Sequence, residues 1–267
     1  SMYDKGEVVT QDSYEAVRWY RKAADQGLAN AQYTLGSMYD KGEGVTRDCN
    51  EASRWYRKAA DQGLAEAQCR LGVMFSLGEG VTEDYTEAAR WFRKAAAQGQ
   101  AKAQYSLGAL YNTGNGVVQD GNEATRWLRK SADQGFANAQ YTLGSMYDKG
   151  EVVTQDSYEA VRWYRKAADQ GLAEAQYRLG VMFTLGEGVV KDLKKANYFL
   201  EAAVAQKEKA RDLLCSVLES EEAALQHRNS SEDTGLGTIP PSQCTCCGRS
   251  ARNDVKLKPC PRCKGPL

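Results

Sequence analysis

The strongest constraint on the fold of this chain is a period of 36 residues that runs without an insertion over most of its length. The tryptophans follow this period: Trp19, Trp55, Trp91, Trp127 and Trp163. Two sets of glycines follow it as well: Gly27, Gly63, Gly99, Gly135 and Gly171, and Gly36, Gly72, Gly108, Gly144 and Gly180. Residues 1–29 are even identical to residues 145–173. Such a period predicts a solenoid in which each repeat packs on its neighbours.

Each repeat predicts two helices, which we name helix A and helix B. In the copy from Asn30 to Gly63, the apolar face of helix A consists of Ala31, Leu35, Met38 and Tyr39. This spacing is typical of an amphipathic helix, and we expect helix A to end near Gly42, where glycine tolerates a positive φ. The apolar face of helix B consists of Ala52, Trp55, Tyr56, Ala59 and Ala60. We expect helix B to end at Gly63 in a Schellman cap closed by Leu64.

Two further features of the repeat predict local contacts. Asp48 stands at the N-cap of helix B with Glu51 three residues later, which predicts a reciprocal capping box. The same pair recurs as Asp12/Glu15, Asp84/Glu87, Asp120/Glu123 and Asp156/Glu159. Gly36 lies inside helix A, where glycine costs about 1 kcal/mol relative to alanine. We therefore expect a large aromatic side chain of helix B, Trp or Tyr, to cross helix A at this glycine.

The repeat resembles the Sel1-like repeat family. The resemblance rests on the run A-x-A-Q-Y-x-L-G-x-M-Y, then G-x-G-V-x-x-D, then E-A-x-R-W-Y-R-K-A-A-D-Q-G, and it covers about residues 1–206. It implies an all-α fold in which antiparallel helix pairs stack into a right-handed α/α superhelix related to tetratricopeptide arrays. It also implies a protein–protein interaction scaffold or adaptor and not an enzyme. One bacterial branch with a disulfide in each repeat is associated with β-lactam binding, but the repeats here lack that cysteine pair.

Composition and motifs agree with a binding protein. Lys+Arg and Asp+Glu are both 35, so no overall field favours nucleic acid or an anionic membrane as a partner. The sequence has no apolar run of about 18 residues that predicts a transmembrane segment. The single histidine, His227, stands beside a polar segment, and nothing indicates a Ser–His or Cys–His nucleophile pair. We therefore expect protein partners and no small-molecule substrate.

The scaffold positions of the repeat are nearly invariant, so partner recognition has to use positions that differ between repeats. In related helical arrays, helix A lines the groove that binds partners. We predict a partner-binding stripe on the helices A, made of charged and polar residues that we expect to be exposed. Its residues are Asn30, Thr34, Glu66, Arg70, Lys102, Ser106, Asn138, Thr142, Glu174 and Arg178.

The sequence divides the chain into four segments: the solenoid at 1–206, a capping helix at 207–227, a flexible linker at 228–243 and a cysteine-rich tail at 244–267. The capping helix is predicted because the segment keeps apolar residues such as Leu214 and Leu218 but lacks the glycines of the repeat. The linker is rich in Ser, Gly, Pro and acidic residues. Ser1 aligns with Ser37 and Ser145, so we expect the sequence to start inside a helix A.

The tail carries two C-x-x-C pairs, which is the spacing of a structural zinc site. The predicted zinc ligands are Cys244, Cys247, Cys260 and Cys263. The run K-L-K-P-C-P-R-C-K resembles the opening half of a MYND zinc finger, which docks peptides of partner proteins. In that family the two pairs bind different zinc ions together with later cysteines and a histidine, which do not follow here before Leu267. A ribbon that binds one zinc ion through these four cysteines is the alternative.

Two alternative functions stay open at this point. The first is a hydrolase of the bacterial Sel1-repeat type that acts on β-lactams. The second is a regulator that associates with nucleic acid through the tail, where basic residues outnumber Asp254. The residues Ser1 to Gly6 lack the apolar region of a signal peptide, and Cys49, Cys69 and Cys215 are scattered as reduced thiols are. The sequence as it stands therefore favours a cytoplasmic or nuclear location.

The two interpretations of the tail predict different metal contents. A truncated MYND finger, which we favour, leaves two half-sites with two thiolates each, and such sites should hold zinc poorly because structural zinc prefers four protein ligands. A ribbon should hold one zinc ion tightly. Native mass spectrometry of the zinc-loaded chain distinguishes them. One tightly bound zinc that disappears in Cys260→Ser would contradict the truncated finger.

Overall fold

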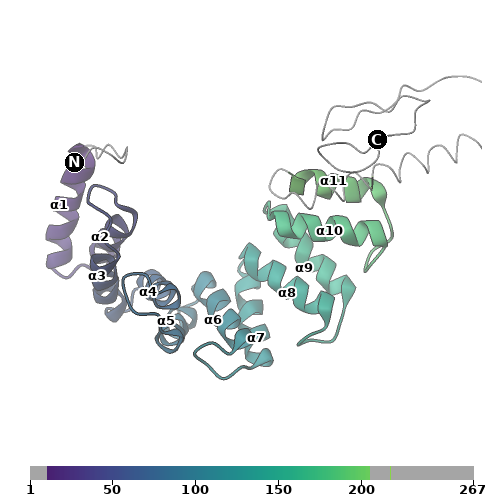
Figure 1. Ribbon diagram of the computed structural model, residues 1–267, viewed down its shortest axis with the longest axis horizontal. Helices are drawn as coiled ribbons and strands as arrows, with labels where there is room; N and C mark the ends of the chain where they lie inside the picture. Colours follow the sequence, from purple (N-terminus) through teal and green to yellow (C-terminus); the bar gives the residue numbers. More distant parts are fainter. Residues whose placement is uncertain (1–10, 205–216, 218–267) are drawn as a thin grey trace, which may run out of the picture. The chain divides into compact units, whose positions relative to one another are not determined.

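The computed structural model describes residues 11–204 and Val217, and this part of the chain is all-helical, with no strand. Its helices, shown in Figure 1, are α1 (Gln11–Asp25), α2 (Ala29–Lys41), α3 (Cys49–Asp61), α4 (Ala65–Leu77), α5 (Tyr85–Ala97), α6 (Ala101–Thr113), α7 (Gly121–Asp133), α8 (Ala137–Lys149), α9 (Ser157–Asp169), α10 (Ala173–Leu185) and α11 (Leu193–Val204). Even-numbered helices are the predicted helices A, and odd-numbered helices are the predicted helices B. Within the described residues, no helix has the length and apolar character that a membrane crossing requires.

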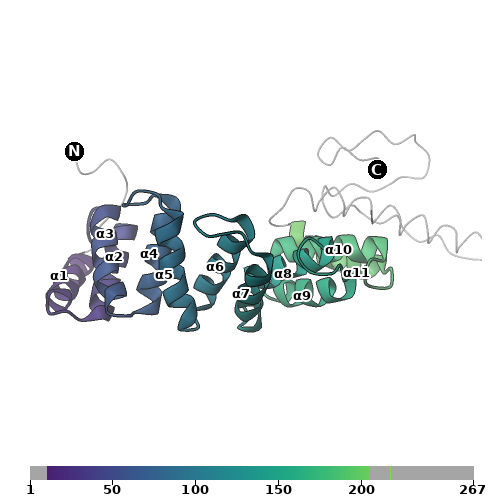
Figure 2. The same ribbon diagram turned by 90° about the horizontal axis from the view of Figure 1, so that it is seen from below.

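The chain divides into two compact units, Ser1–Ala139 and Gln140–Leu267, and the division falls inside α8. In the first unit each helix packs against the next one in the sequence, so α1 contacts α2, α2 contacts α3, and this order continues to α7. Figure 2 shows the same order from α1 to α5. In the second unit α10 packs against both α9 and α11. The predicted solenoid of helix pairs is therefore confirmed within each unit. The predicted linker and tail lie outside the described residues, as does the capping helix except for Val217.

Helix A and helix B of one repeat meet at the glycine inside helix A. A Cβ atom on Gly72 would lie only 2.7 Å from Cδ1 of Phe92. The prediction of a close crossing is confirmed, but the crossing residue follows the tryptophan and is not always aromatic. The crossing pairs are Gly36 with Tyr56, Gly72 with Phe92, Gly108 with Leu128, Gly144 with Tyr164, and Gly180 with Leu200. Helix A keeps glycine there because alanine would collide with a fully buried side chain.

Trp55 and Trp91 join consecutive repeats in the first unit. Trp55 is buried in a cluster with Val17 and Ala24 of the preceding helix B, and with Leu35 of its own helix A. Trp91 lies in the equivalent cluster with Ala59 and Ala60. Alanine faces these rings because its small side chain lets the helices approach closely. The helix pair therefore completes its core only when the neighbouring repeat is in place.

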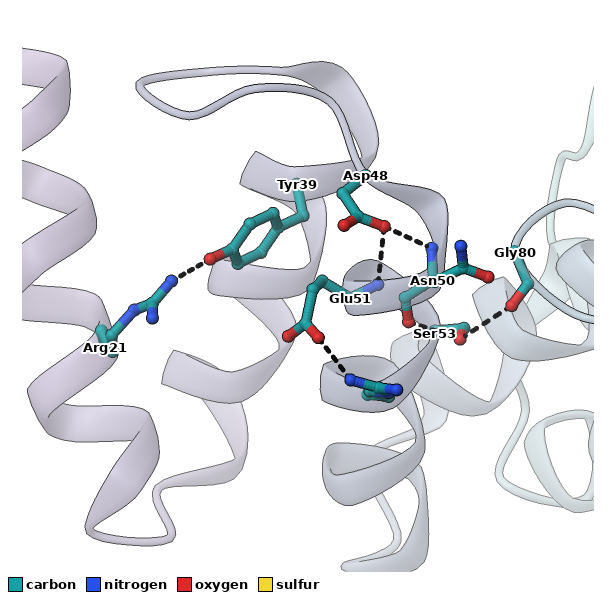
Figure 3. Close-up of polar contacts among 8 residues, drawn as sticks. Arg21, Tyr39, Asp48, Asn50, Glu51, Ser53 and Gly80 are labelled. Atoms are coloured by element: carbon teal, nitrogen blue, oxygen red, sulfur yellow. Dashed lines mark hydrogen bonds and ion pairs between the residues drawn. The ribbon is translucent and has the colours of Figure 1, made fainter.

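The N-terminal end of helix B has the predicted aspartate cap but not the predicted reciprocal contact. The Asp48 side chain accepts hydrogen bonds from the backbone N–H groups of Asn50 and Glu51, at 2.9 and 3.1 Å (Figure 3). The reciprocal half of the capping box is wrong. The backbone N–H of Asp48 donates to the Tyr39 carbonyl at 2.9 Å, and the Glu51 side chain pairs with Arg54. The carbonyl of the preceding helix thus already satisfies the donor that Glu51 was expected to reach.

The other end of helix B has the predicted Schellman cap. The Leu64 N–H donates to the Ala59 carbonyl at 3.2 Å, and the Gly63 N–H donates to the Ala60 carbonyl at 3.0 Å. Gly63 has a φ of +95°, which is the left-handed backbone that this cap requires. The turn from helix B to the next helix A therefore has the same geometry that its glycine predicts.

A second glycine in the loop after helix A lets neighbouring repeats touch through their backbones. A Cβ atom on Gly80 would lie 2.0 Å from the Cys49 carbonyl oxygen at the start of the preceding helix B. The Ser53 hydroxyl donates to the Gly80 carbonyl at 3.1 Å across the same contact (Figure 3). Gly44, Gly116 and Gly188 stand equally close to the preceding helices. These glycines support the repeat contact.

Replacing Gly80 by Ala should destabilise the first unit far more than replacing Gly78. Both residues have left-handed backbone, with φ of +66° and +68°, so either alanine costs about 1–2 kcal/mol in backbone conformation. Only at Gly80 does the new methyl group also collide with backbone, because the nearest atom to a Cβ on Gly78 is 3.5 Å away. We expect Gly80→Ala to melt several degrees below Gly78→Ala by circular dichroism. Equal melting temperatures would contradict the proposed backbone contact.

Candidate functional site

The predicted stripe lies on helices A, and in the first unit its residues alternate in exposure. Asn30, Glu66 and Lys102 occupy the same position on α2, α4 and α6, and all three are exposed. Four residues later on the same faces, Thr34, Arg70 and Ser106 are half-buried. Of the remaining predicted residues, Asn138 is exposed, whereas Thr142, Glu174 and Arg178 are half-buried. The first position of each pair is therefore the one most open to a partner.

Arg70 makes a structural contact between two repeats. Its guanidinium forms an ion pair with Asp40 of the preceding helix A, whose side chain is only 7% exposed. The Tyr56 hydroxyl donates to the same Asp40 carboxylate at 3.4 Å. Burial raises the pKa of Tyr56 to about 12, although the nearby Arg70 acts against this rise. Tyr56 is thus a neutral donor at ordinary pH, and Arg70 supplies the charge that lets Asp40 be buried.

The second unit repeats this contact with the same residue types. Arg178 forms an ion pair with Asp148, and the Tyr164 hydroxyl donates to Asp148 at 3.2 Å. Burial also raises the pKa of Tyr164. Two repeats lie between these sets, and their equivalent positions hold Ser76, Phe92 and Ser106, then Asn112, Leu128 and Thr142. At these four crossings the carboxylate and the arginine are present where the crossing residue is tyrosine, and absent where it is phenylalanine or leucine.

Arg70 and Arg178 consequently differ from the exposed charges that we expected on the stripe. About one third of each side chain is exposed, 33% for Arg70 and 36% for Arg178, and the guanidinium of each serves a buried carboxylate. A signal for this contact was present in the sequence. Asp and Arg stand 30 residues apart in both sets, at Asp40/Arg70 and Asp148/Arg178.

A ladder of glutamines supports the same helices and was not predicted. Gln68 on α4 is buried, and its side-chain amide donates to the Ala60 carbonyl of the preceding helix B at 3.0 Å. Gln98 at the end of α5 then donates to Gln68 Oε1 at 2.8 Å. The same link occurs as Gln62 to Gln32, Gln134 to Gln104 and Gln170 to Gln140. The ladder satisfies buried amide groups, so helix A is held by polar contacts as well as by apolar packing.

The structure adds an apolar residue to the face that carries Glu66 and Arg70. Leu77 follows Arg70 by seven residues, which places it on the same side of α4, and 60% of it is exposed. Leu185 is 61% exposed at the equivalent position of α10. This position is Lys41 in α2 and Thr113 in α6. Its variation from repeat to repeat is the same signal that defined the stripe, and it could have been found in the sequence.

Two free cysteines lie among the described residues, and Cys69 is the buried one. Burial raises the pKa of the Cys69 thiol to about 11, so this cysteine stays protonated and unreactive at neutral pH. Among residues 11–204 and Val217, no group of three or more His, Cys, Asp or Glu side chains could hold a metal ion. The predicted zinc ligands Cys244, Cys247, Cys260 and Cys263 lie outside this part of the chain.

Comparison with known proteins identifies the repeat. The family model described as Sel1 repeat matches six consecutive segments: residues 1–28, 29–64, 65–100, 101–136, 137–172 and 173–208. The segment 29–64 contains one helix A and the helix B that crosses it at Gly36, as the sequence predicted. No protein with a curated functional description matches the chain.

Two solved structures are similar over most of the chain. One is c5321, a protective antigen of uropathogenic Escherichia coli strains with an SLR fold, which is 39% identical with a TM-score of 0.76. That match covers 83% of this chain and 48% of c5321, so this chain spans about half the length of that protein. The other is a Sel1 repeat protein from Oxalobacter formigenes, which is 37% identical with a TM-score of 0.72. That match covers 77% of this chain and 84% of the other.

Replacing Arg70 by Met should cost about 2–3 kcal/mol, because the Asp40 carboxylate would stay buried without its cation. A triple variant tests whether the unpaired carboxylate causes this loss, because it removes the charges of Asp40 and Arg70 together. It introduces the side-chain types of Ser76, Phe92 and Ser106. It combines Asp40→Ser, Tyr56→Phe and Arg70→Ser. We expect the triple variant to melt above Arg70→Met in scanning calorimetry. A triple variant that melts below the single variant would show that the buried charge is not the cause.

Proposed function

Because this chain belongs to the Sel1-repeat family, whose members are generally protein-interaction scaffolds, we propose that it binds a partner protein along the exposed face of its helices A. The observation that carries this proposal is the position shared by Asn30, Glu66 and Lys102. It is exposed on three successive helices of the first unit, and it is neutral, acidic and basic in turn. A surface that changes charge at each step can select one partner over another.

The residues around this position support recognition of a polypeptide. Leu77 offers an exposed apolar contact on the same face as Glu66, and Arg70 is held in place by the buried Asp40. A guanidinium with a fixed position loses little freedom when a partner binds, which favours affinity. Arg70 and Arg178 therefore have two roles in this proposal: each stabilises a repeat contact and presents the remaining part of its guanidinium to the partner.

We further propose that the cysteine-rich tail contributes ligands to a zinc-binding module that docks a second peptide. Cys244, Cys247, Cys260 and Cys263 have the residue type and the paired spacing of structural zinc ligands. An adaptor of this kind would hold two partners, one on the solenoid and one on the tail. A cytoplasmic or nuclear location suits reduced cysteines that bind zinc.

Charge reversal on the stripe should remove the partner without unfolding the solenoid. The test variant combines Glu66→Lys with Lys102→Glu, because both side chains are exposed and exposed charges contribute little to stability. Affinity capture with quantitative mass spectrometry then compares it with the unchanged chain. We expect the captured partner to fall at least about tenfold while the melting temperature stays within a few degrees.

A matched control uses the loop after α4 and the helix B of the same repeat. Glu83→Lys with Lys94→Glu also exchanges one acid and one base at exposed positions, and neither residue belongs to a helix A. This control should keep the partner. Loss of the same partner in both double variants would mean that net charge pattern, and not the helix A face, determines capture.

A further inference from the structure

A second surface lies on helix B of the second unit, outside the helix A stripe. The side chains of α9 and the loop after α10 enclose a half-open hollow of about 260 Å³. This volume is below the range of about 300–1,000 Å³ that is usual for small-molecule sites, and it suits a side chain of a peptide. Its lining from α9 includes the apolar residues Tyr158 and Val161 and the cations Arg162, Arg165 and Lys166. The lining also includes Asp169 of α9 and Val189 of the loop.

The three cations of this hollow differ in whether they already interact with another residue of the chain. Arg162 pairs with Glu159, and the Lys166 ammonium lies 3.9 Å from the centre of the Trp163 ring. Arg165 has no hydrogen bond or ion pair with any residue in the described part of the chain. The reason is a difference between repeats. The equivalent Arg93 donates to the Tyr111 hydroxyl at 3.2 Å, whereas the residue at the position equivalent to Tyr111 in the last described helix A is Phe183, which has no hydroxyl.

The hollow has one exposed apolar lining residue, Tyr158, and its apolar pair Tyr158 and Val161 recurs on only one other helix B. Tyr158 is 67% exposed and Val190, next to the loop residue of the lining, is 88% exposed. The arginine and lysine positions recur on every helix B from α1 to α9, but tyrosine and valine accompany them only on α9 and on α1, as Tyr14 and Val17. The three helices B between them have Asn50, Thr86 and Asn122 in place of the tyrosine. The combination of a free guanidinium with exposed apolar groups is what distinguishes this surface.

We propose that this hollow binds an acidic peptide segment of a partner protein, with a carboxylate on Arg165 and a neighbouring aliphatic side chain against Tyr158 and Val189. Charge complementarity supports a carboxylate, because an unpaired arginine forms bidentate hydrogen bonds with this group. A phosphate group fits less well: it carries up to two charges, only one guanidinium is unengaged, and Asp169 adds a negative charge to the lining. Tyrosine beside arginine is the pair of residue types that most often provides binding energy at interfaces.

The probe is a fluorescein-labelled peptide of glutamates with one leucine at its centre, measured by fluorescence anisotropy on the full chain. All proteins carry Tyr14→Asn, so that the duplicated residues of α1 do not contribute. We expect Arg165→Gln to weaken binding about tenfold, as loss of one charge-assisted hydrogen bond does. Tyr158→Asn, which introduces the residue type of Asn50, should weaken it similarly. Both residues are exposed, and circular dichroism checks that the variants stay folded.

The matched control is Arg57→Gln. Arg57 occupies the same position on α3 and faces Phe75, with 5.4 Å from its guanidinium carbon to the ring centre, but its helix lacks the tyrosine. Binding should be unchanged in this variant and in the stripe variant Glu66→Lys with Lys102→Glu. It should also disappear when the peptide's glutamates become glutamines, and weaken as salt is raised.

Several results would overturn the proposal. No measurable binding, or equal binding of the glutamine peptide, would exclude recognition of carboxylates. An equal effect of Arg57→Gln would mean that the basic helices B attract acids without a specific site. A short DNA duplex that displaces the peptide and depends on Arg165 and Tyr158 in the same way would show a nucleic-acid surface instead. Because the stripe variant is measured alongside, failure here is distinguishable from failure of the helix A proposal.

Discussion

The close approach of helix B to helix A at one glycine is the constraint on which the remaining structure depends. At Gly72 the ring of Phe92 occupies the space where a Cβ atom would be, so the two helix backbones come closer than any other residue would permit. This crossing places the preceding residue, Trp91, against the alanines of the previous helix B. The glycine inside the repeat therefore also sets the contact between repeats, and the period of 36 residues is kept because both contacts must recur together.

Polar contacts between helices add to the apolar packing that holds the repeats together. The glutamine ladder links α2, α4 and α6 each to two helices B, and at two places an Asp–Tyr–Arg set adds a largely buried charge with its partner. Buried charges seldom add net stability, but they penalise every arrangement that leaves them unpaired. Because Asp40 needs Arg70 from the next repeat, this contact favours the correct neighbour among repeats whose sequences are almost the same. Packing against the wrong neighbour is a greater risk for nearly identical repeats than for diverged ones.

Positions that differ between repeats do not all serve partner recognition. Variation between repeats was taken as the signal of recognition, yet Arg70 and Arg178 vary together with Asp40 and Asp148 because they serve the interior. Arg165 shows the opposite case. Its position carries arginine in every helix B from α1 to α9 and would be assigned to the scaffold, but replacement of a tyrosine by Phe183 leaves Arg165 without a hydrogen-bond partner in the described residues. The same position of the repeat can thus serve stability in one copy and binding in another. The identity of the neighbouring side chain decides which of the two it serves.

The sequence by itself determined the repeat, the two helices, the aspartate N-caps of the helices B and the glycine-ended turns, because these depend on contacts within a few residues or on a strict period. It also predicted a close crossing at Gly36. Only the tertiary structure decided which side chain crosses there, that Tyr39 and not Glu51 satisfies the Asp48 N–H, and which charges are buried. These outcomes depend on distances between side chains of different helices, and a residue's position in the period does not specify those distances.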